Sequence, residues 1–186
     1  MCIYKLSSIA ATSYLLSAPC LAAQAPNLGQ VATPEEILSW DISISPDGSG
    51  LPPGSGTAKQ GEVLYGAQCA SCHGDTGTGN PQEPPSPVSA GPLARGQGSL
   101  AGNQPPMQTV GSYWPYATTL FDYIRRAMPW ATPKSLTDDE VYSLTAYILH
   151  LNGIIGDTEI IDAQALPKVQ MPNRDNFIRI YPREPG

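Results

Sequence analysis

The sequence predicts a small all-α domain with irregular extensions at its N- and C-terminal ends. Three windows carry helical patterns, one starting near Ala58, one near Thr118 and one just after Thr137. Proline (20 of 186 residues) and glycine (18) are abundant and lie mostly outside these windows, and both residues disfavour helix interiors. Hydrophobic residues make up 41% of the chain, which is enough to form a core.

Residues 1–25 read as a secretory signal peptide. Lys5 supplies a positive start, residues 9–16 form an apolar stretch, and "CLAAQA" offers small residues for cleavage within residues 22–25. The apolar stretch is too short and too often interrupted to span the ~20 residues of a bilayer core. A lipid anchor on Cys20 fits poorly because a proline directly precedes it. We therefore expect an exported, periplasmic protein without a membrane span.

Loss of this segment would remove Cys2 and Cys20 and leave Cys69 and Cys72. A framework of structural disulfides is then excluded. The chain carries 10 basic and 16 acidic residues, a net charge of −6. Such a chain has no extended basic face to neutralise phosphates, so nucleic-acid binding is excluded as well.

The motif Cys69-Ala70-Ser71-Cys72-His73 carries the chemistry of the chain. A zinc site needs about four ligands, and the other candidate, His150, lies alone and far along the sequence. A thioredoxin-like redox pair needs a βαβ setting, which is not readable here. CxxCH is the attachment signal of c-type haem, in which two thiols add to the vinyl groups and His73 becomes the proximal iron ligand. We expect one covalently attached haem c.

The segment before this motif, "TAKQGEVLYGAQ", predicts a helix from about Ala58 with Gly61, Leu64 and Tyr65 on one side. Together with the haem motif it resembles the class I cytochrome c family. In that family a glycine and an aromatic residue four positions later let the first helix cross the last one closely. The resemblance gives these roles to Gly61 and Tyr65.

The last helix is marked at both ends. Thr137 and Glu140 form a capping-box pattern, and Gly153 is placed to end the helix. Tyr147 is the candidate for the contact with Gly61. Apolar residues recur at helical spacing and indicate a core-facing stripe: Val141, Leu144, Tyr147 (or Ile148) and Leu151.

An electron-carrying haem normally has a sixth ligand, and methionine opposite histidine raises its reduction potential. The methionines after the signal are Met107, Met128 and Met171. Met128 follows the helix that starts near Thr118, and Pro129 ends that helix. In the cytochrome c family the distal methionine lies in such a loop before the last helix. We expect Met128 as the ligand, with Met107 as the runner-up.

Weaker signals nominate residues around the haem. A ligating histidine usually donates its other N–H to a carbonyl, and "AGPLARG" resembles the turn that serves this in cytochromes c, which nominates Pro92. Arg125 and Arg126 could pair with the haem propionates, or be solvated on an exposed helix face. Trp114, in the aromatic tract 113–116, could donate to the propionates or form a wall of the crevice.

Three tracts carry a closer resemblance: residues 33–74, residues 109–155 and "ALPKVQMPNRDNF" at 165–177. They are similar to the cytochrome c subunit of sulfane dehydrogenase (the SoxD type) and of related bacterial sulfite dehydrogenases. The resemblance implies an electron-transfer subunit that pairs with a molybdopterin-containing catalytic subunit and passes electrons to a downstream cytochrome or oxidase. The single CxxCH resembles the single-haem form.

The residues support this division of labour. The mature chain has no cysteine left to bind molybdenum, and a six-coordinate haem leaves no open site for a substrate, so we do not expect an enzyme by itself. A free-standing mono-haem shuttle and a haem enzyme such as a thiosulfate dehydrogenase are the alternatives. Long arms disfavour the shuttle, and Met128 disfavours the haem enzyme.

The expected organisation is a signal peptide (1–25), an N-terminal arm (26–57), a cytochrome c domain (58–153) with a proline-rich insertion after the haem motif, and a C-terminal extension (154–186). In the N-terminal arm "WDISIS" alternates like a short half-buried strand, and prolines keep the C-terminal extension from forming a helix. Neither arm can form its own core. We expect both to bind a partner, the alternative being that they wrap their own domain.

Overall fold

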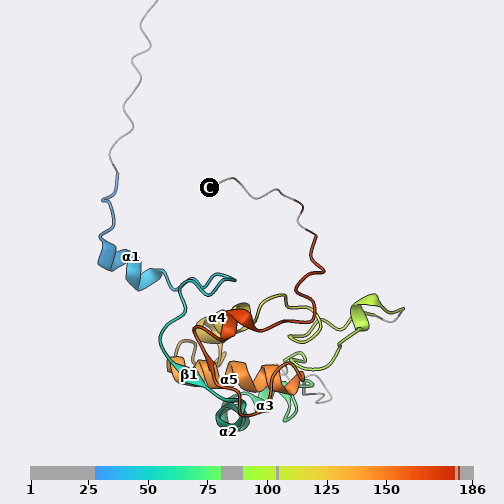
Figure 1. Ribbon diagram of the computed structural model, residues 1–186. Coiled ribbons are helices and arrows are strands. Elements are labelled where there is room, and N and C mark those ends of the chain that lie inside the picture. The colour runs from blue at the N-terminus through green and yellow to red at the C-terminus, as the bar shows by residue number, and fades with distance from the viewer. Residues whose placement is uncertain (1–27, 81–89, 104, 179, 181–186) are drawn as a thin grey trace, which may run out of the picture.

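The computed structural model describes residues 28–80, 90–103, 105–178 and 180 (Figure 1). The expected signal peptide and most of the proline-rich insertion lie outside these residues. The regular secondary structure of the described residues is mainly helical, with one two-stranded sheet, which confirms the predicted all-α class. Within the described ranges no helix has the length and apolar character needed to cross a membrane.

The helices and strands follow one another along the chain in this order: α1 (Pro34–Trp40), β1 (Ser55–Gly56), α2 (Ala58–Gln68), α3 (Ala70–His73), the 3-10 turn η1 (Ser99–Ala101), α4 (Ala117–Ala127), α5 (Asp138–Leu151), β2 (Ile161–Asp162) and the 3-10 turn η2 (Leu166–Lys168). Helix α5 lies at the centre, and α2, α4, β1 and β2 pack around it.

Helices α2 and α5 cross closely at Gly61. A Cβ atom at Gly61 would overlap the backbone carbonyl of Ser143 and lie 2.8 Å from the Cβ of Tyr147. Next to this crossing the rings of Tyr65 and Tyr147 lie 5.1 Å apart, centroid to centroid. The predicted Gly61–Tyr147 contact is therefore confirmed. Thr57 caps α2 by accepting a hydrogen bond from the N–H of Gln60.

Helix α5 begins at the predicted capping box, in which the side chains of Thr137 and Glu140 satisfy each other's backbone N–H groups. Gly153 follows its end with φ +65°, as a C-terminal glycine should. The prediction of a single core-facing stripe was too narrow, because four elements surround this helix. Its buried residues are Val141, Tyr142, Ser143, Leu144, Thr145, Ala146, Ile148 and Leu149.

The inner parts of both arms belong to the cytochrome core. β1 from the N-terminal arm pairs antiparallel with β2 from the C-terminal extension. Ile161, Leu166 and Met171 of the extension are 0–3% exposed and join the hydrophobic core. The Tyr142 hydroxyl of α5 donates a 2.8 Å hydrogen bond to the carbonyl of Pro52. The expectation that the arms mainly bind a partner is therefore wrong for these inner parts, which cover apolar surface of their own domain.

The expected strand at "WDISIS" is not formed. Thr33 and Glu36 make a capping box with a proline in the first turn, and this starts a helix that includes Trp40. Trp40 is 86% exposed, and the chain that follows it is irregular. The capping box upstream accounts for the helical position of Trp40, and residues 41–45 follow the helix without forming a strand.

Candidate functional site

A mainly apolar cavity of about 500 Å³ lies beside the CxxCH motif. Three groups of residues line it. The potential ligands are Cys69, Cys72, His73 and Met128; the aliphatic walls include Leu93, Val110, Leu120, Ile124, Leu144 and Ile148; the aromatic residues are Trp114, Tyr123 and Trp130. No charged side chain is among the lining residues that the structure describes.

The backbone folds the motif tightly around one turn of helix. The chain bends at Cys69, between α2 and α3, and the N–H groups of Cys72 and His73 both donate to the Cys69 carbonyl. Gly74 ends α3 with φ +75°, a conformation that suits glycine. The Tyr65 hydroxyl donates a 2.9 Å bond to the Gly74 carbonyl and ties this turn to α2.

Both thiols of the motif are free and reach the cavity. Burial, reinforced by the neighbouring Cys72, raises the pKa of Cys69 to about 11. A catalytic redox cysteine has the opposite property, a lowered pKa that yields a thiolate near neutral pH. The environment of Cys69 therefore argues against a dithiol oxidoreductase.

The imidazole of His73 is oriented by a backbone carbonyl. Its Nδ1 lies 3.0 Å from the carbonyl oxygen of Gly91, which leaves Nε2 available to a metal. The sequence had nominated the Pro92 carbonyl, one residue later. The N–H of Leu93 donates to Gly77, and in a trans peptide the Pro92 carbonyl must then point away from Gly77. Pro92 itself lines the cavity.

Met128 reaches the cavity from the end of α4. Its N–H donates to the Ile124 carbonyl as the last bond of that helix, and Pro129 has no N–H with which to continue it. Of the other described methionines, Met107 is 43% exposed and Met171 is buried in the core; neither lines the cavity. Met128 is thus the thioether available to the cavity among the described residues.

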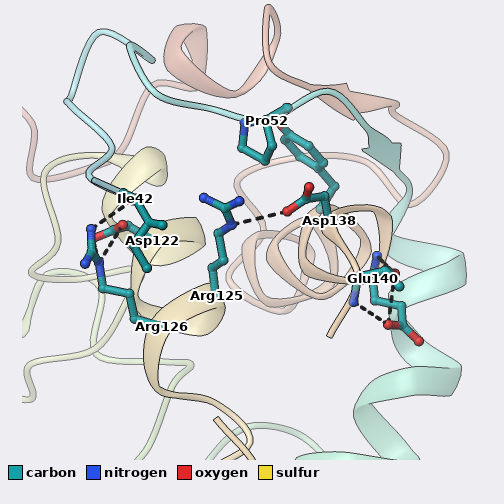
Figure 2. A network of polar contacts seen from close by, with 9 residues as sticks. Ile42, Pro52, Asp122, Arg125, Arg126, Asp138 and Glu140 are labelled. Carbon is teal, nitrogen blue, oxygen red and sulfur yellow. Dashed lines mark hydrogen bonds and ion pairs between the residues drawn. The ribbon is translucent and has the colours of Figure 1, made fainter. Parts of the chain in front are cut away.

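The two arginines of α4 bind groups of the chain itself and do not line the cavity. Figure 2 shows Arg125 paired with Asp138, 3.2 Å from Nε to the carboxylate. Arg126 binds Asp122 through Nε at 2.8 and 2.9 Å and donates to the Ile42 carbonyl at 2.9 Å. This differs from the expected pairing with haem propionates, because acidic groups and a carbonyl of the chain itself already engage both guanidinium groups.

The aromatic tract before α4 divides between two roles. Trp114 lines the cavity and packs edge-to-face on Tyr123 at 5.8 Å. Tyr113 instead packs on Phe177 at 5.4 Å, and Tyr116 lies under the guanidinium of Arg174 at 5.5 Å. The last two contacts hold the C-terminal extension against the domain.

Sequence reasoning missed two aromatic residues that border the cavity, Tyr123 and Trp130. Tyr123 lies three residues after Leu120 on α4, and Leu120 also lines the cavity, so the helical spacing could have nominated Tyr123. Trp130 is 78% exposed and lies in irregular chain after Pro129, where no periodicity identifies a side chain's direction.

The donor set fits a haem c and does not fit a metal ion held by protein ligands alone. Two thiols, an imidazole and a thioether meet in one apolar cavity. Across the described residues there is no group of three or more histidine, cysteine, aspartate or glutamate side chains suited to a metal ion. Cys69 and Cys72 could hold the porphyrin, and His73 and Met128 could bind its iron.

Comparison with known proteins agrees with this geometry. Residues 56–148, half of the chain, match the family described as cytochrome c oxidase, cbb3-type, subunit III. This chain belongs to the cytochrome c family. Its fold is also similar to a chain of the crystal structure of the sulfane dehydrogenase SoxCD from Paracoccus pantotrophus. The TM-score is 0.72 at 41% identity, and the match covers 86% of this chain and 73% of that one.

The predicted resemblance to SoxD-type cytochromes is confirmed by this likeness. A comparison with curated protein sequences gave no match. The cytochrome c domain is an electron-transfer module, so the chain is not a catalytic enzyme on its own.

Proposed function

We propose that this chain is the periplasmic electron-transfer subunit of a molybdenum-containing dehydrogenase that oxidises a sulfur compound, sulfite or a sulfane sulfur. One observation carries the proposal: the likeness to SoxCD at 41% identity extends over 86% of the chain. The match to the general cytochrome family covers only residues 56–148. The likeness therefore includes parts of the arms, which a general cytochrome c does not require.

The residues of the cavity have distinct tasks in this proposal. When bound, haem c supplies one-electron exchange between ferric and ferrous iron. Cys69 and Cys72 would hold it by thioether bonds, and His73 would bind the iron through Nε2, because the Gly91 carbonyl fixes the ring by accepting a hydrogen bond from Nδ1. Met128, which lines the same cavity, would bind the iron through its thioether sulfur, and such a ligand favours the ferrous state. The aliphatic walls exclude water from the site.

The chain accepts single electrons from the catalytic subunit and delivers them to a downstream cytochrome or oxidase. Met128 at the cavity argues against the haem enzyme, because its thioether would occupy the iron position that a substrate needs. The exposed α1 favours a subunit over a free-standing shuttle, since Leu38 and Trp40 on that helix are 73% and 86% exposed, and neighbouring exposed apolar side chains are typical of a stable protein–protein interface.

The covalent assignment is tested by replacing both cysteines with serine. The single variants Cys69→Ser and Cys72→Ser should keep haem by one thioether or lose it, and the double variant should release all haem into acid–acetone. Haem that stays with the double variant after extraction contradicts the assignment. A mature N-terminus within residues 22–25, found by mass spectrometry of protein from a periplasmic extract, would support export.

The role as a subunit is tested by purification of the tagged chain from its own cells. We expect a molybdenum-containing protein in the eluate, identified by metal analysis, and no oxidation of sulfite or thiosulfate by the chain after separation from it. Recovery of the chain alone would favour the shuttle, and turnover by the separated chain would favour the haem enzyme.

A further inference from the structure

The N-terminal segment 28–40 exposes apolar side chains that the helical body does not cover. Figure 1 shows α1 clear of that body. We call the large exposed apolar side chains of this segment the α1 patch: Leu28 (86% exposed), Val31 (97%), Ile37 (53%), Leu38 (73%) and Trp40 (86%). None of them packs against the hydrophobic core. Exposing the apolar surface of a tryptophan and a leucine to water is unfavourable in free energy. Neighbouring apolar side chains with such exposure are typical of a binding surface.

Helix α1 is too short to be stable by itself. It has seven residues, whereas an isolated helix shorter than about 12–15 residues is marginal in water. Its capping box stabilises only the first turn, and the helix gains no packing against the core cluster. A surface that covers the apolar side chains would supply the missing stabilisation.

The chain that follows α1 is fixed to the domain. Arg126, held by Asp122, donates to the Ile42 carbonyl two residues after Trp40 (Figure 2). Farther on, Ile44 and Leu51 pack against the core. The α1 patch therefore projects from an anchored point, which lowers the entropy lost when a partner orders it.

Charge identifies the kind of partner. Residues 26–58 contain no lysine or arginine, while Glu35, Glu36 and Asp41 lie on or directly after α1. An anionic lipid surface would repel such a segment, and so would a second copy of this chain, whose net charge is −6. The complementary surface is an apolar groove bordered by lysine and arginine side chains.

We infer that the α1 patch docks into an apolar groove with a basic rim on the molybdenum-containing catalytic subunit. This inference rests on the proposed function and specifies where the two subunits meet. Trp40 is the anchor, because tryptophan side chains that become buried at the centre of an interface contribute most of the binding energy. The acidic residues add attraction that weakens as salt concentration rises.

The test measures the dissociation constant of the full-length haem-loaded chain for the catalytic subunit that co-purifies with it, by titration calorimetry after separating the two. Trp40→Ala and Leu38→Ala are compared with Val63→Ala, a matched control on α2 that is 76% exposed. We expect Trp40→Ala to weaken binding at least tenfold, Leu38→Ala severalfold, and Val63→Ala less than twofold. All three should keep the wild-type haem spectrum, because none lines the cavity.

Unchanged affinity in Trp40→Ala overturns the inference while leaving the proposed function intact. Equal losses in Val63→Ala and Leu38→Ala overturn it as well, since the effect would not be confined to the α1 patch. If sedimentation shows that the isolated chain forms a dimer which Trp40→Ala dissociates, a second copy is the occupant and the inference is wrong. If no molybdenum protein co-purifies with the wild-type chain, the proposed function fails first.

Discussion

Two glycines on helix α2 should respond to alanine in opposite directions. At Gly61 a Cβ would overlap the backbone carbonyl of Ser143 on α5 and lie 2.8 Å from the Cβ of Tyr147. At Gly66, five residues later, a Cβ would meet nothing within 4 Å. Gly61→Ala and Gly66→Ala are therefore the same chemical change on the same helix, with and without the close crossing.

The magnitudes follow from two effects. Alanine favours the helix over glycine by about 0.8–1 kcal/mol, and this gain applies to both variants. Overpacking costs typically about 1–3 kcal/mol, and the upper end applies at Gly61 because a backbone carbonyl cannot move to another rotamer. Gly66→Ala should thus raise the free energy of unfolding by nearly 1 kcal/mol, and Gly61→Ala should lower it by about 2 kcal/mol.

The assay is urea unfolding of the haem-loaded chain, followed by far-ultraviolet circular dichroism and analysed by linear extrapolation. The difference between the two variants, about 3 kcal/mol, is the quantity of interest because it cancels the shared helix propensity. A Gly61→Ala variant as stable as Gly66→Ala would refute the close crossing of α2 and α5.

Three further predictions address the site and the C-terminal extension. Met128→Ala should abolish the near-infrared-edge absorption band of Met–Fe(III) ligation and lower the reduction potential, whereas Met107→Ala should keep both; the reverse result would make Met107 the ligand. Leu166→Ala, at a fully buried position, should lower the free energy of unfolding by about 2–5 kcal/mol. A change below about 0.5 kcal/mol is typical of a surface residue and would contradict the packing of the extension in the core. Backbone N–H groups of Ala165 and Gln164 lower the pKa of Asp162, so its stabilisation is present above the usual carboxyl pKa and lost as pH falls through the lowered value. Asp162→Asn should therefore flatten the acid side of a stability–pH profile; an unchanged profile would contradict this.

The helices around the cavity were predictable because their signals are local. The capping box at Thr137 and Glu140 and the helix break at Pro129 each depend on residues a few positions apart. The crossing at Gly61 was predictable for a different reason, since the cytochrome c resemblance supplied a long-range contact that no pattern within α2 contains. The burial of an unbroken run of α5, from Val141 to Ala146, was not predictable, because it depends on packing against β1 and β2, which come from distant parts of the chain.

The contacts of the arginines were also hidden from the sequence. Arg126 has Asp122 one turn earlier on its own helix, a spacing that favours an ion pair, yet its bond to Ile42 depends on where the N-terminal arm lies. The carbonyl that orients His73 was missed by one residue because peptide orientation within the turn is set by the hydrogen bond from Leu93 to Gly77. Spacing identifies ligands more readily than it identifies backbone acceptors.

The account depends most on the claim that this chain carries electrons for a separate catalytic subunit. The direct measurement is the visible absorption spectrum of the oxidised chain after addition of sulfite or a sulfane sulfur substrate, with and without the co-purifying molybdenum protein. We predict that the ferric spectrum persists in the chain alone and changes to the ferrous spectrum when a catalytic amount of that protein is added. Reduction by substrate in the chain alone, at the rate seen with the partner, would contradict the account.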